Sequence, residues 1–544
     1  DEVINECYKM LPSNWLHYML NLFNTILNAQ KVPASWGKIK MKMIHKKGCP
    51  LEPTNYRGIA LVNSLVKILT KILNKRLVDW VENKNIIPEE QMGFRQQRGC
   101  RDAVFSLSSL VNIHLRIKRA RVYGIFVDFQ RAFDSLSHGK LWEKLNGVAI
   151  YGRAVNTIKD LYEKASVFIE NNGGVTNEFK VSEGVLQGEN LSSLLFTLYI
   201  QNIIHFFRDH GAVGVSVDQK DDVLMLLYAD DIVILGFSWQ DVQFKLDLLH
   251  KYCCSNSLNV NIDKTKVLPF HKGSKLGKHR KCFYNKKEIE IVKEFKYLGL
   301  VFTANGKFKK ASEHNTSLGT AASTKVKGIL CKGKSDTWEA KEVLFDSMVG
   351  SVLLYCGEVW SVPFADSIDK VQIKFFKSLL QLPRSTPDAL IRFETGRVHL
   401  ELQIFKILIE WWVLLLKMGN GRIPRMCYNR LYSMHNCQQM PFNWCSFLRR
   451  CLEKIGAVHL WENNNYIEVN KNKNNLVNAY KCHLISIDIS MIYNTKYNSF
   501  IRFVTRFVNE ESYLKLNIPF EFLRIMAQLR LVNNKFPRII VNRR

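Results

Sequence analysis

Two adjacent aspartates, Asp230 and Asp231, stand between two apolar segments rich in strand-forming residues, 225–228 and 232–235. This pattern predicts a β-hairpin with both carboxylates at its turn. Carboxylates held this close repel each other unless a cation neutralises them. Such oxygen ligands suit Mg²⁺, which takes one or two carboxylates and completes its shell with water and phosphate oxygens. An isolated Asp-Asp pair is more often a solvated turn, so the rest of the sequence has to decide.

A third carboxylate, Asp128, ends another apolar segment, 123–127, and a helix is expected after Ser137. If the strands that carry these aspartates are neighbours in one sheet, Asp128, Asp230 and also Asp231 can bind two divalent ions. Two such ions lower the pKa of an attacking hydroxyl and stabilise the leaving oxygen of an in-line phosphoryl displacement. That chemistry needs no His, Cys or Ser nucleophile, and the sequence has no arrangement that would supply one.

The composition indicates a polyanionic partner. The 544 residues include 77 Lys and Arg against 49 Asp and Glu, a formal net charge of +28. Because the excess recurs along the whole chain, nucleic acid is the expected partner. Membrane lipid competes with it, but the most apolar tract, 402–418, contains Lys406, Glu410 and Lys417 and therefore predicts a buried helix.

The length exceeds what one compact core holds, so two to four domains are expected. With 47% hydrophobic residues, burial is not limiting. No signal peptide opens the chain, and its 13 cysteines show no regular framework. These features predict reduced thiols and an intracellular location, in the nucleus, the cytoplasm or both.

The elements that must position the aspartates follow in order. Helical periodicity predicts helices over 13–30 and 64–82, with a strand over 38–45 between them. The Gly- and Arg-rich segment 91–102 predicts a loop that opens a helix, and a helix N-terminus beside arginines can hold an anion.

Two further loops carry residues suited to nucleotide contacts. Lys46, Lys47 and Arg57 come together around one loop, where they would clamp phosphate oxygens. Gln187 and Gly188 form a turn before an apolar helix; the glycine permits close backbone approach, and the amide can bond to a base pair or sugar. Each signal alone also fits a solvated hairpin or a simple helix start.

Several segments in a fixed order resemble reverse transcriptases, specifically those of non-LTR (LINE-type) retrotransposons. The segments similar to the family's motifs A to E are 127–134, 184–192, 228–231, 258–266 and 295–299, and those similar to its fingers motifs are 55–59 and 91–95. A Tyr-x-Asp-Asp tetrapeptide alone would be a weak signal, but this ordered series over 40–305 is highly specific.

The resemblance implies a role for each matching position. Asp128, Asp230 and Asp231 would be the metal-binding carboxylates, with the backbone carbonyl of Phe129 as a further ligand. The implied cofactor is Mg²⁺, as two ions, with Mn²⁺ as an alternative. Phe133 matches the family's aromatic steric gate against a ribose 2′-hydroxyl, a role compatible with core packing.

Other matching positions would contact the substrate. Arg57, with Lys46 or Lys47, would hold the triphosphate, and Arg131 would line the nucleotide pocket. Gln187 and Gly188 would touch the incoming nucleotide or the template. Lys264 could protonate the leaving pyrophosphate, although an ordinary surface lysine fits this position nearly as well.

Three departures from the family pattern stand out. Gly58 replaces a proline, Ser193 replaces another, and the pair Glu189-Asn190 is uncommon at its place. None of them removes a metal ligand, so they bear on rate and fidelity more than on chemistry.

The implied fold class is α+β: a right-hand polymerase with fingers, a palm with an antiparallel sheet, a helical thumb and a helical C-terminal extension. The expected divisions are 1–120 for the N-terminal helix and fingers, 121–305 for the palm with part of the fingers, 306–400 for the thumb, and 401–544 for a basic helical region.

The implied reaction is DNA synthesis on an RNA template, from dNTPs and a DNA primer 3′-hydroxyl, which in relatives belongs to the nicked target DNA. The expected partners are template RNA, primer or target DNA and dNTPs, with no membrane and an open oligomeric state. Group II intron or telomerase reverse transcriptases, an RNA-dependent RNA polymerase, and a decayed element protein that only binds nucleic acid remain as alternatives.

Overall fold

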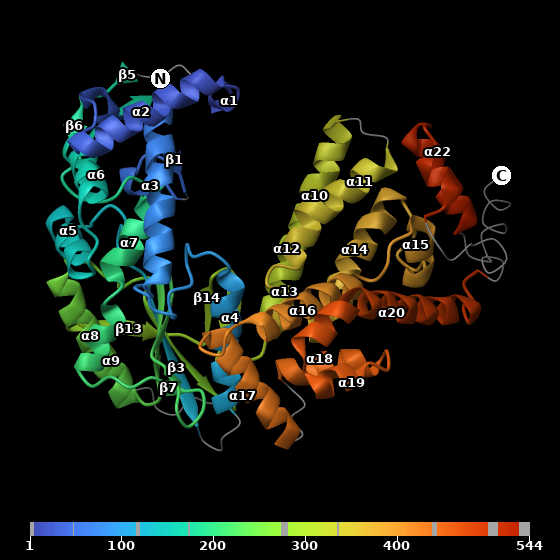
Figure 1. The fold of residues 1–544 in the computed structure, drawn as a ribbon. Helices are drawn as coiled ribbons and strands as arrows, with labels where there is room; N and C mark the ends of the chain where they lie inside the picture. Colours follow the sequence, from blue (N-terminus) through green and yellow to red (C-terminus); the bar gives the residue numbers. More distant parts are fainter. Residues whose placement is uncertain are drawn as a thin grey trace.

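The computed structural model of the chain describes residues 5–46, 48–115, 120–171, 174–273, 281–333, 337–437, 443–498 and 510–531. Two arms stand on a common base (Figure 1). One arm contains α2 (Ser13–Ala29) and α3 (Ser64–Asn83), and the other contains α10 (Lys309–Gly333) and α14 (Ala365–Leu379). Helices and strands both contribute to the base, which confirms the predicted α+β class.

The base contains a six-stranded sheet in the order β12-β13-β11-β3-β10-β9. The strands are β3 (Arg121–Val127), β9 (Met225–Tyr228), β10 (Asp231–Gly236), β11 (Lys266–His271), β12 (Cys282–Tyr284) and β13 (Lys287–Ile291). Neighbours are antiparallel except β11 and β13, which run parallel, so the prediction of an antiparallel sheet holds for four of the five pairs. The exception arises because β12 forms the edge of the sheet, so that its hairpin partner β13 lies between β12 and β11.

Alternate residues of the central strand enter two separate cores, because successive side chains of a strand point to opposite faces. Val122 and Phe126 of β3 belong to a first core, whereas Tyr123, Ile125 and Val127 belong to a second. The helices of the second core include α2, α3, α5 (His138–Gly147), α7 (Ser192–Ile200) and α9 (Trp239–Ser255). The first core combines α4 (Cys100–His114) with helices that follow residue 308. The sheet is therefore the wall between the two cores.

A smaller sheet supports the first arm. Its strands are β1 (Lys38–His45), β2 (Tyr56–Leu61), β4 (Ser166–Asn171), β5 (Gly174–Val175) and β6 (Phe179–Lys180). The strand predicted over 38–45 coincides with β1, and the helices predicted over 13–30 and 64–82 match α2 and α3 within one residue at each end. The sheet presents the loop after β1 toward the main sheet.

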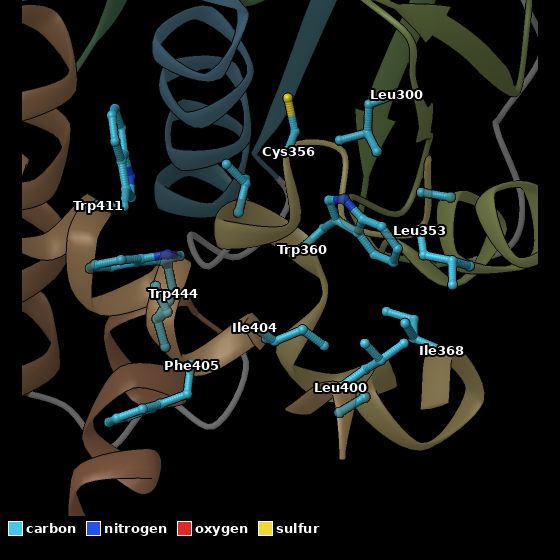
Figure 2. Close-up of a cluster of buried hydrophobic side chains, with 14 of the residues drawn as sticks. Leu300, Leu353, Cys356, Trp360, Ile368, Leu400, Ile404, Phe405, Trp411 and Trp444 are labelled. Carbon is cyan, nitrogen blue, oxygen red and sulfur yellow. The ribbon is translucent and has the colours of Figure 1, made fainter. Parts of the chain in front are cut away.

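The C-terminal helices pack around a cluster of large aromatic residues (Figure 2). They include α16 (Leu400–Lys417), α17 (Ile423–Cys437), α18 (Trp444–Glu453) and α20 (Tyr466–Tyr493). Trp411 and Trp412 of α16 are fully buried, which confirms that the apolar tract 402–418 is a core helix. Over the residues that the structure describes, no helix is both long and apolar enough to cross a bilayer.

One buried ionic cluster joins the second arm to the C-terminal helices. Arg392 of α15 (Asp388–Thr395) donates two hydrogen bonds to Asp488 of α20, at 2.6 and 2.7 Å, and one to Asp369 of α14, at 2.8 Å. Burial opposes ionisation, but hydrogen bonds from Arg392 and His399 outweigh it and lower the pKa of Asp488. The fork geometry of the guanidinium thus holds three helices together.

Candidate active site

The three aspartates meet at one end of the main sheet. Tyr228 pairs with Asp231, so Ala229 and Asp230 form the turn of the predicted β9–β10 hairpin. Ile232 pairs with Val127 across β10 and β3, and the same register continued by one residue puts Asp231 opposite Asp128. Directly opposed residues share one face of a sheet, with Cβ atoms about 5 Å apart. The structure therefore brings together all three predicted carboxylates.

A buried glutamine supports the hairpin turn from behind. The Ala229 N–H donates to Oε1 of Gln91 at 3.0 Å, and the Gly93 N–H donates to the same oxygen at 2.9 Å. Ala229 has a positive φ of 56°, and a Cβ on Gly93 would lie 2.4 Å from its nitrogen. Sequence reasoning missed this role, although the match of 91–95 to a family motif was the available signal.

The carboxylates carry an electrostatic cost that a cation would relieve. Burial, followed by the charge of Asp128, raises the pKa of Asp230. Although the Asp231 residue is exposed, desolvation and then the charges of Asp230 and Asp128 raise its pKa to about 6. The Oδ2 atom of Asp128 is buried and accepts no hydrogen bond from the described residues, with Nζ of Lys264 3.3 Å away.

The donor set fits Mg²⁺ as an open site. Among the described residues, no three His, Cys, Asp or Glu side chains form a group that could hold a metal ion unaided. Mg²⁺ does not need one, since it is commonly bound by one or two carboxylates plus water and substrate phosphate oxygens. Asp128, Asp230 and Asp231 supply such carboxylates, and the buried Oδ2 of Asp128 still lacks a hydrogen-bond donor.

The backbone at Phe129 points toward the same place. The Gln130 N–H donates to the carbonyl of Asn259, and the Asn261 N–H donates to that of Asp128, each at 2.7 Å. The N–H of Gln130 and the carbonyl of Asp128 therefore both point toward the segment that precedes β11. Because carbonyls alternate in direction along an extended strand, the Phe129 carbonyl faces the other side, toward β10.

A basic group lies across from the carboxylates. Burial, followed by the charges of Arg57 and Lys264, lowers the pKa of Lys46, while Asp134 and Asp128 act in the opposite direction. The β1–β2 register pairs Ile44 with Arg57, and the Lys46 N–H donates to the carbonyl of Asn55 at 2.8 Å, so Lys46, just after β1, and Arg57 of β2 lie on neighbouring segments. The predicted clamp therefore comes together for Lys46 and Arg57, whereas Lys47 lies outside the described residues.

The loop 184–188 joins the smaller sheet to the segment after β3. The Ala60 N–H donates to the carbonyl of Gln187 at 2.7 Å, and Gly188 has a φ of +102°. Gly184 has a φ of +83°, and a Cβ there would lie 2.6 Å from the carbonyl oxygen of Asp134. Both glycines are thus required by backbone conformation, and Gly184 also by close approach.

The predicted gate and pocket residues follow Asp128 directly. Phe133 is half-buried and stacks on Phe196 of α7, with ring centroids 4.7 Å apart and planes 25° apart. Its carbonyl accepts a 2.7 Å hydrogen bond from the Val185 N–H. Arg131 is exposed with a positive φ of 48°, and its charge counters the burial that raises the pKa of Asp134.

Two of the departures from the family pattern have a structural explanation. Glu189 is buried, and its carboxylate accepts a 2.8 Å hydrogen bond from the Leu191 N–H at the start of α7. Asn190 donates to the carbonyl of Lys67 on α3 at 2.9 Å, which ties the loop to that helix. At Gly58 a Cβ would lie 2.5 Å from the sulfur of Met41.

The ionic contacts at the start of α4 give no support to the predicted anion site. Two of the three arginines there are paired with carboxylates: Arg95 donates to both oxygens of Glu82, at 2.6 and 2.7 Å, and Arg98 lies 2.5 Å from Glu89. The guanidinium of the third, Arg101, lies 5.1 Å from the centre of the Trp411 ring. The carboxylate of Asp102 accepts a hydrogen bond from the Gly99 N–H at the helix start. These contacts therefore fix the loop.

A cavity of about 530 Å³ opens beside the carboxylates. Asp128, Asp231 and Lys264 line one part of it, and the hairpin of β14 (Glu294–Tyr297) and β15 (Leu300–Thr303) lines another. The ring of Phe295 in β14 stacks on Phe126 of β3 at 4.3 Å, which holds this hairpin against the sheet.

Residues 44–302 match the family model of reverse transcriptases (RNA-dependent DNA polymerases). These residues form a reverse transcriptase domain. It is related to the corresponding domains of non-LTR retrotransposons, as the sequence resemblance predicted. The described strands of the main sheet all lie within or at the edge of this domain.

Three relatives of the reverse transcriptase domain come from mobile elements of Drosophila melanogaster. The RNA-directed DNA polymerase from mobile element jockey of Drosophila melanogaster is 25% identical over 394 residues, 70% of this chain and 41% of that protein. The probable RNA-directed DNA polymerase from transposon BS of the same species is 26% identical, covering 69% and 41%. The Pol polyprotein of retrotransposable element R2DM is 29% identical over 54% of this chain and 27% of that protein. The chain spans about two fifths of the length of the first two relatives.

Among solved structures, apo telomerase from Candida tropicalis is 15% identical and covers 76% of this chain and 74% of its own, with a TM-score of 0.39. The same telomerase in complex with a fragment of telomeric RNA is 14% identical and covers 77% of this chain and 68% of its own, with a TM-score of 0.37.

Proposed function

We propose that this chain is an RNA-directed DNA polymerase of a non-LTR retrotransposon, which extends a DNA primer on an RNA template and is primed at its target. The observation that carries the proposal is the cross-strand placement of Asp128 and Asp231, with Asp230 on the adjoining turn, inside a reverse transcriptase domain. The net charge of +28 supports a polyanionic partner.

The carboxylates and the Phe129 carbonyl would hold two Mg²⁺ ions, with Mn²⁺ as a substitute. Ions bound there would supply charge stabilisation for the attacking and leaving oxygens of the phosphoryl transfer. The raised pKa values of Asp230 and Asp231 support this assignment, because both carboxylates gain from a neighbouring cation.

The chain's own side chains would bind and orient the dNTP. Lys46 and Arg57 would donate hydrogen bonds to the triphosphate, and the tight turn at Gln187 and Gly188 lets the backbone approach the base pair. Arg131 would line the nucleotide pocket. Lys47, beside Lys46 in the sequence, is proposed for the same clamp.

The primer 3′-hydroxyl would lose its proton to solvent and its oxygen would form the new bond to the α-phosphorus, while the bond from that phosphorus to the bridging oxygen of pyrophosphate would break. Lys264 would give its ammonium proton to the leaving oxygen. Its Nζ lies 3.3 Å from Asp128, so it is already beside the reacting groups. Phe133 would exclude a ribose 2′-hydroxyl from the pocket.

We assign residues 1–120 to the N-terminal helix and fingers, 121–305 to the palm with part of the fingers, 306–400 to the thumb and 401–544 to a basic C-terminal region. Template RNA, a DNA primer and dNTPs are the proposed partners. An intracellular location, nuclear or cytoplasmic, suits a partner of this kind.

Primer extension on an RNA template with Mg²⁺ tests the function. We expect the wild-type chain to extend with dNTPs and not with rNTPs, and Asp230→Ala to abolish extension while still binding the primer–template. Asp79→Ala, which removes an exposed carboxylate of α3, is the matched control and should extend normally.

The outcomes separate the alternatives. A wild-type chain that binds primer–template tightly without extending it would be a nucleic-acid-binding scaffold from a decayed element. Extension with rNTPs as efficient as with dNTPs would contradict the gate assignment of Phe133 and favour an RNA polymerase. Extension that survives Asp230→Ala would contradict the proposed metal ligands.

A further inference from the structure

A second cavity, of about 930 Å³, lies between α4, the segment that begins with α13 (Gly357–Trp360), and α18. None of its lining residues lines the cavity beside the catalytic carboxylates. Its volume falls in the range typical of ligand sites, which are mostly apolar with a few polar groups. The cavity is therefore a candidate for a site separate from catalysis.

The inner wall of this cavity is aromatic. Phe105, Trp360 and Trp444 line it and are almost fully buried. The rings of Phe105 and Trp444 meet edge to face at 5.4 Å, and Figure 2 shows Trp360 and Trp444 in the same buried cluster. Both indole N–H groups donate inside the protein, to the carbonyls of Tyr355 and Glu358 at 2.9 and 2.7 Å. Because so little of their surface is accessible, these rings form an apolar floor behind the more exposed rings of the lining.

Two half-buried phenylalanines extend the aromatic lining toward the outside. They are Phe364 of η4 (Val362–Phe364) and Phe447 of α18. The guanidinium of Arg450 lies 5.0 Å from the centre of the Phe447 ring. A flat ring next to a cation is the combination on which nucleic-acid bases stack without regard to sequence.

Basic residues dominate the charged part of the lining. Lys272, Lys307, Arg450 and Lys454 are exposed, and Glu401 is the one carboxylate among the lining residues. Glu401 pairs with Lys454 at 2.7 Å, so the lining has an excess of three positive charges. The site thus combines an apolar interior with a cationic rim.

We infer that this cavity binds a nucleotide of single-stranded nucleic acid, with the base against the half-buried rings of Phe364 and Phe447 and the flanking phosphates over the basic rim. The cations come from three separate segments, after β11, before α10 and on or just after α18, which is a wider spread than one phosphate needs. A strand therefore fits the site better than a free mononucleotide. Ser109 and Asn112 of α4 line the same cavity.

Binding, and not catalysis, tests this inference. The probe is a fluorescently labelled 12-nucleotide RNA without secondary structure, titrated by anisotropy against the full chain preloaded with an unlabelled primer–template. No dNTP is present, so a chain without polymerase activity can still give the expected result. The variant is Lys272→Ala/Arg450→Ala, and the matched control is Lys471→Ala/Lys481→Ala, which removes the same charge from exposed positions of α20.

We expect the cavity variant to bind the RNA about tenfold more weakly at moderate salt, and its log–log salt slope to fall by about 1.4 for two lost contacts with a single strand. Ser109→Phe, which fills the cavity, should weaken binding with no change in charge. Thermal unfolding of every variant checks that the fold persists.

Two results would overturn the inference. One is a cavity variant whose affinity and salt slope equal those of the α20 control. The other is competition by uridine monophosphate as strong as by the unlabelled 12-nucleotide strand, because the site would then be one for free mononucleotides.

Discussion

Gln91 and Ala229 are joined by a buried hydrogen bond across 138 residues of sequence, from the N–H of Ala229 to Oε1 of Gln91. The same oxygen accepts from the Gly93 N–H, so one side-chain atom fixes both the loop and the turn that carries Asp230. Asp230 is the next residue after Ala229. The position of this carboxylate, a proposed metal ligand, therefore depends on a glutamine outside the proposed ligand set.

The first prediction concerns this support. Gln91→Leu leaves two buried N–H groups without their acceptor, at about 1–3 kcal/mol each. Gly93→Ala puts a Cβ 2.4 Å from the Ala229 nitrogen and forces the turn to shift. We expect primer extension to fall at least tenfold in both variants, with a lower thermal unfolding midpoint. In the control, Gly139→Ala, the new Cβ meets no atom within 4 Å, and activity should persist.

If Gln91→Leu extends primers at the wild-type rate, the turn holds its geometry without the glutamine. A loss confined to stability, with normal extension at low temperature, would also contradict the positioning role.

The second prediction concerns Phe133. Its stacking on Phe196 fixes the ring, and Phe133→Ala should open space for a 2′-hydroxyl. We expect the preference for dNTP over rNTP to fall by tenfold or more, which corresponds to about 1.4 kcal/mol. Phe133→Tyr keeps the ring and should keep the preference. Single-nucleotide incorporation kinetics measure the preference of both variants. An unchanged preference in Phe133→Ala would contradict the assignment of Phe133 as the steric gate.

The third prediction concerns Lys144, which is largely buried and has no carboxylate partner among its described contacts. Its ammonium donates to Asn202 and to the hydroxyl of Tyr252, and burial lowers its pKa to about 7. In the unfolded chain its pKa is close to 10.5. Between these two pKa values the unfolded state binds more protons than the folded state. The contribution of Lys144 to the free energy of unfolding therefore increases as the pH rises.

Urea unfolding of wild type and Lys144→Met at pH 7, 8 and 9 checks this. The stability difference, wild type minus variant, should grow with pH by at most about 1.4 kcal/mol per unit. The difference isolates Lys144, since the buried cysteines and tyrosines are the same in both proteins. A difference that is flat or falls with pH would contradict the prediction.

The fourth prediction concerns the Arg392 cluster. Asp488→Ala leaves a buried guanidinium with Asp369 as its remaining carboxylate partner in the cluster, and removing one member of a buried pair costs about 3–5 kcal/mol. We expect a large fall in the denaturant midpoint. Asp366→Ala, on the exposed side of α14, is the control and should change stability little. Equal midpoints for the two variants would show that the cluster does not hold the helices.

Local patterns predicted the elements well. The alternation of 38–45 and the helical period of 64–82 depend on neighbours in sequence, and β1 and α3 follow them. The Asp230 hairpin was predictable for the same reason, since its turn residues and both apolar strands lie within 12 positions.

Pairing across long separations was not predictable. The arginines 95 and 98 suggested a free anion site because nothing in the local pattern shows that Glu82 and Glu89 turn toward them. The hydrogen bond from Ala229 to Gln91 and the parallel pairing of β13 with β11 were not predicted for the same reason. Each depends on how distant segments meet, which periodicity and turn chemistry do not specify.

Because α4 belongs to the first core, it packs against helices that the ribosome synthesises much later. Arg422 bonds Asp102 across 320 residues, and Cys427 of α17 contacts the carbonyl of Ser106 across 321. At 5–20 residues per second, a ribosome makes α4 about 15 to 60 seconds before its partner helix. During that interval the apolar side of α4 has no native partner from α17, so the nascent chain must be shielded from aggregation until α17 has emerged.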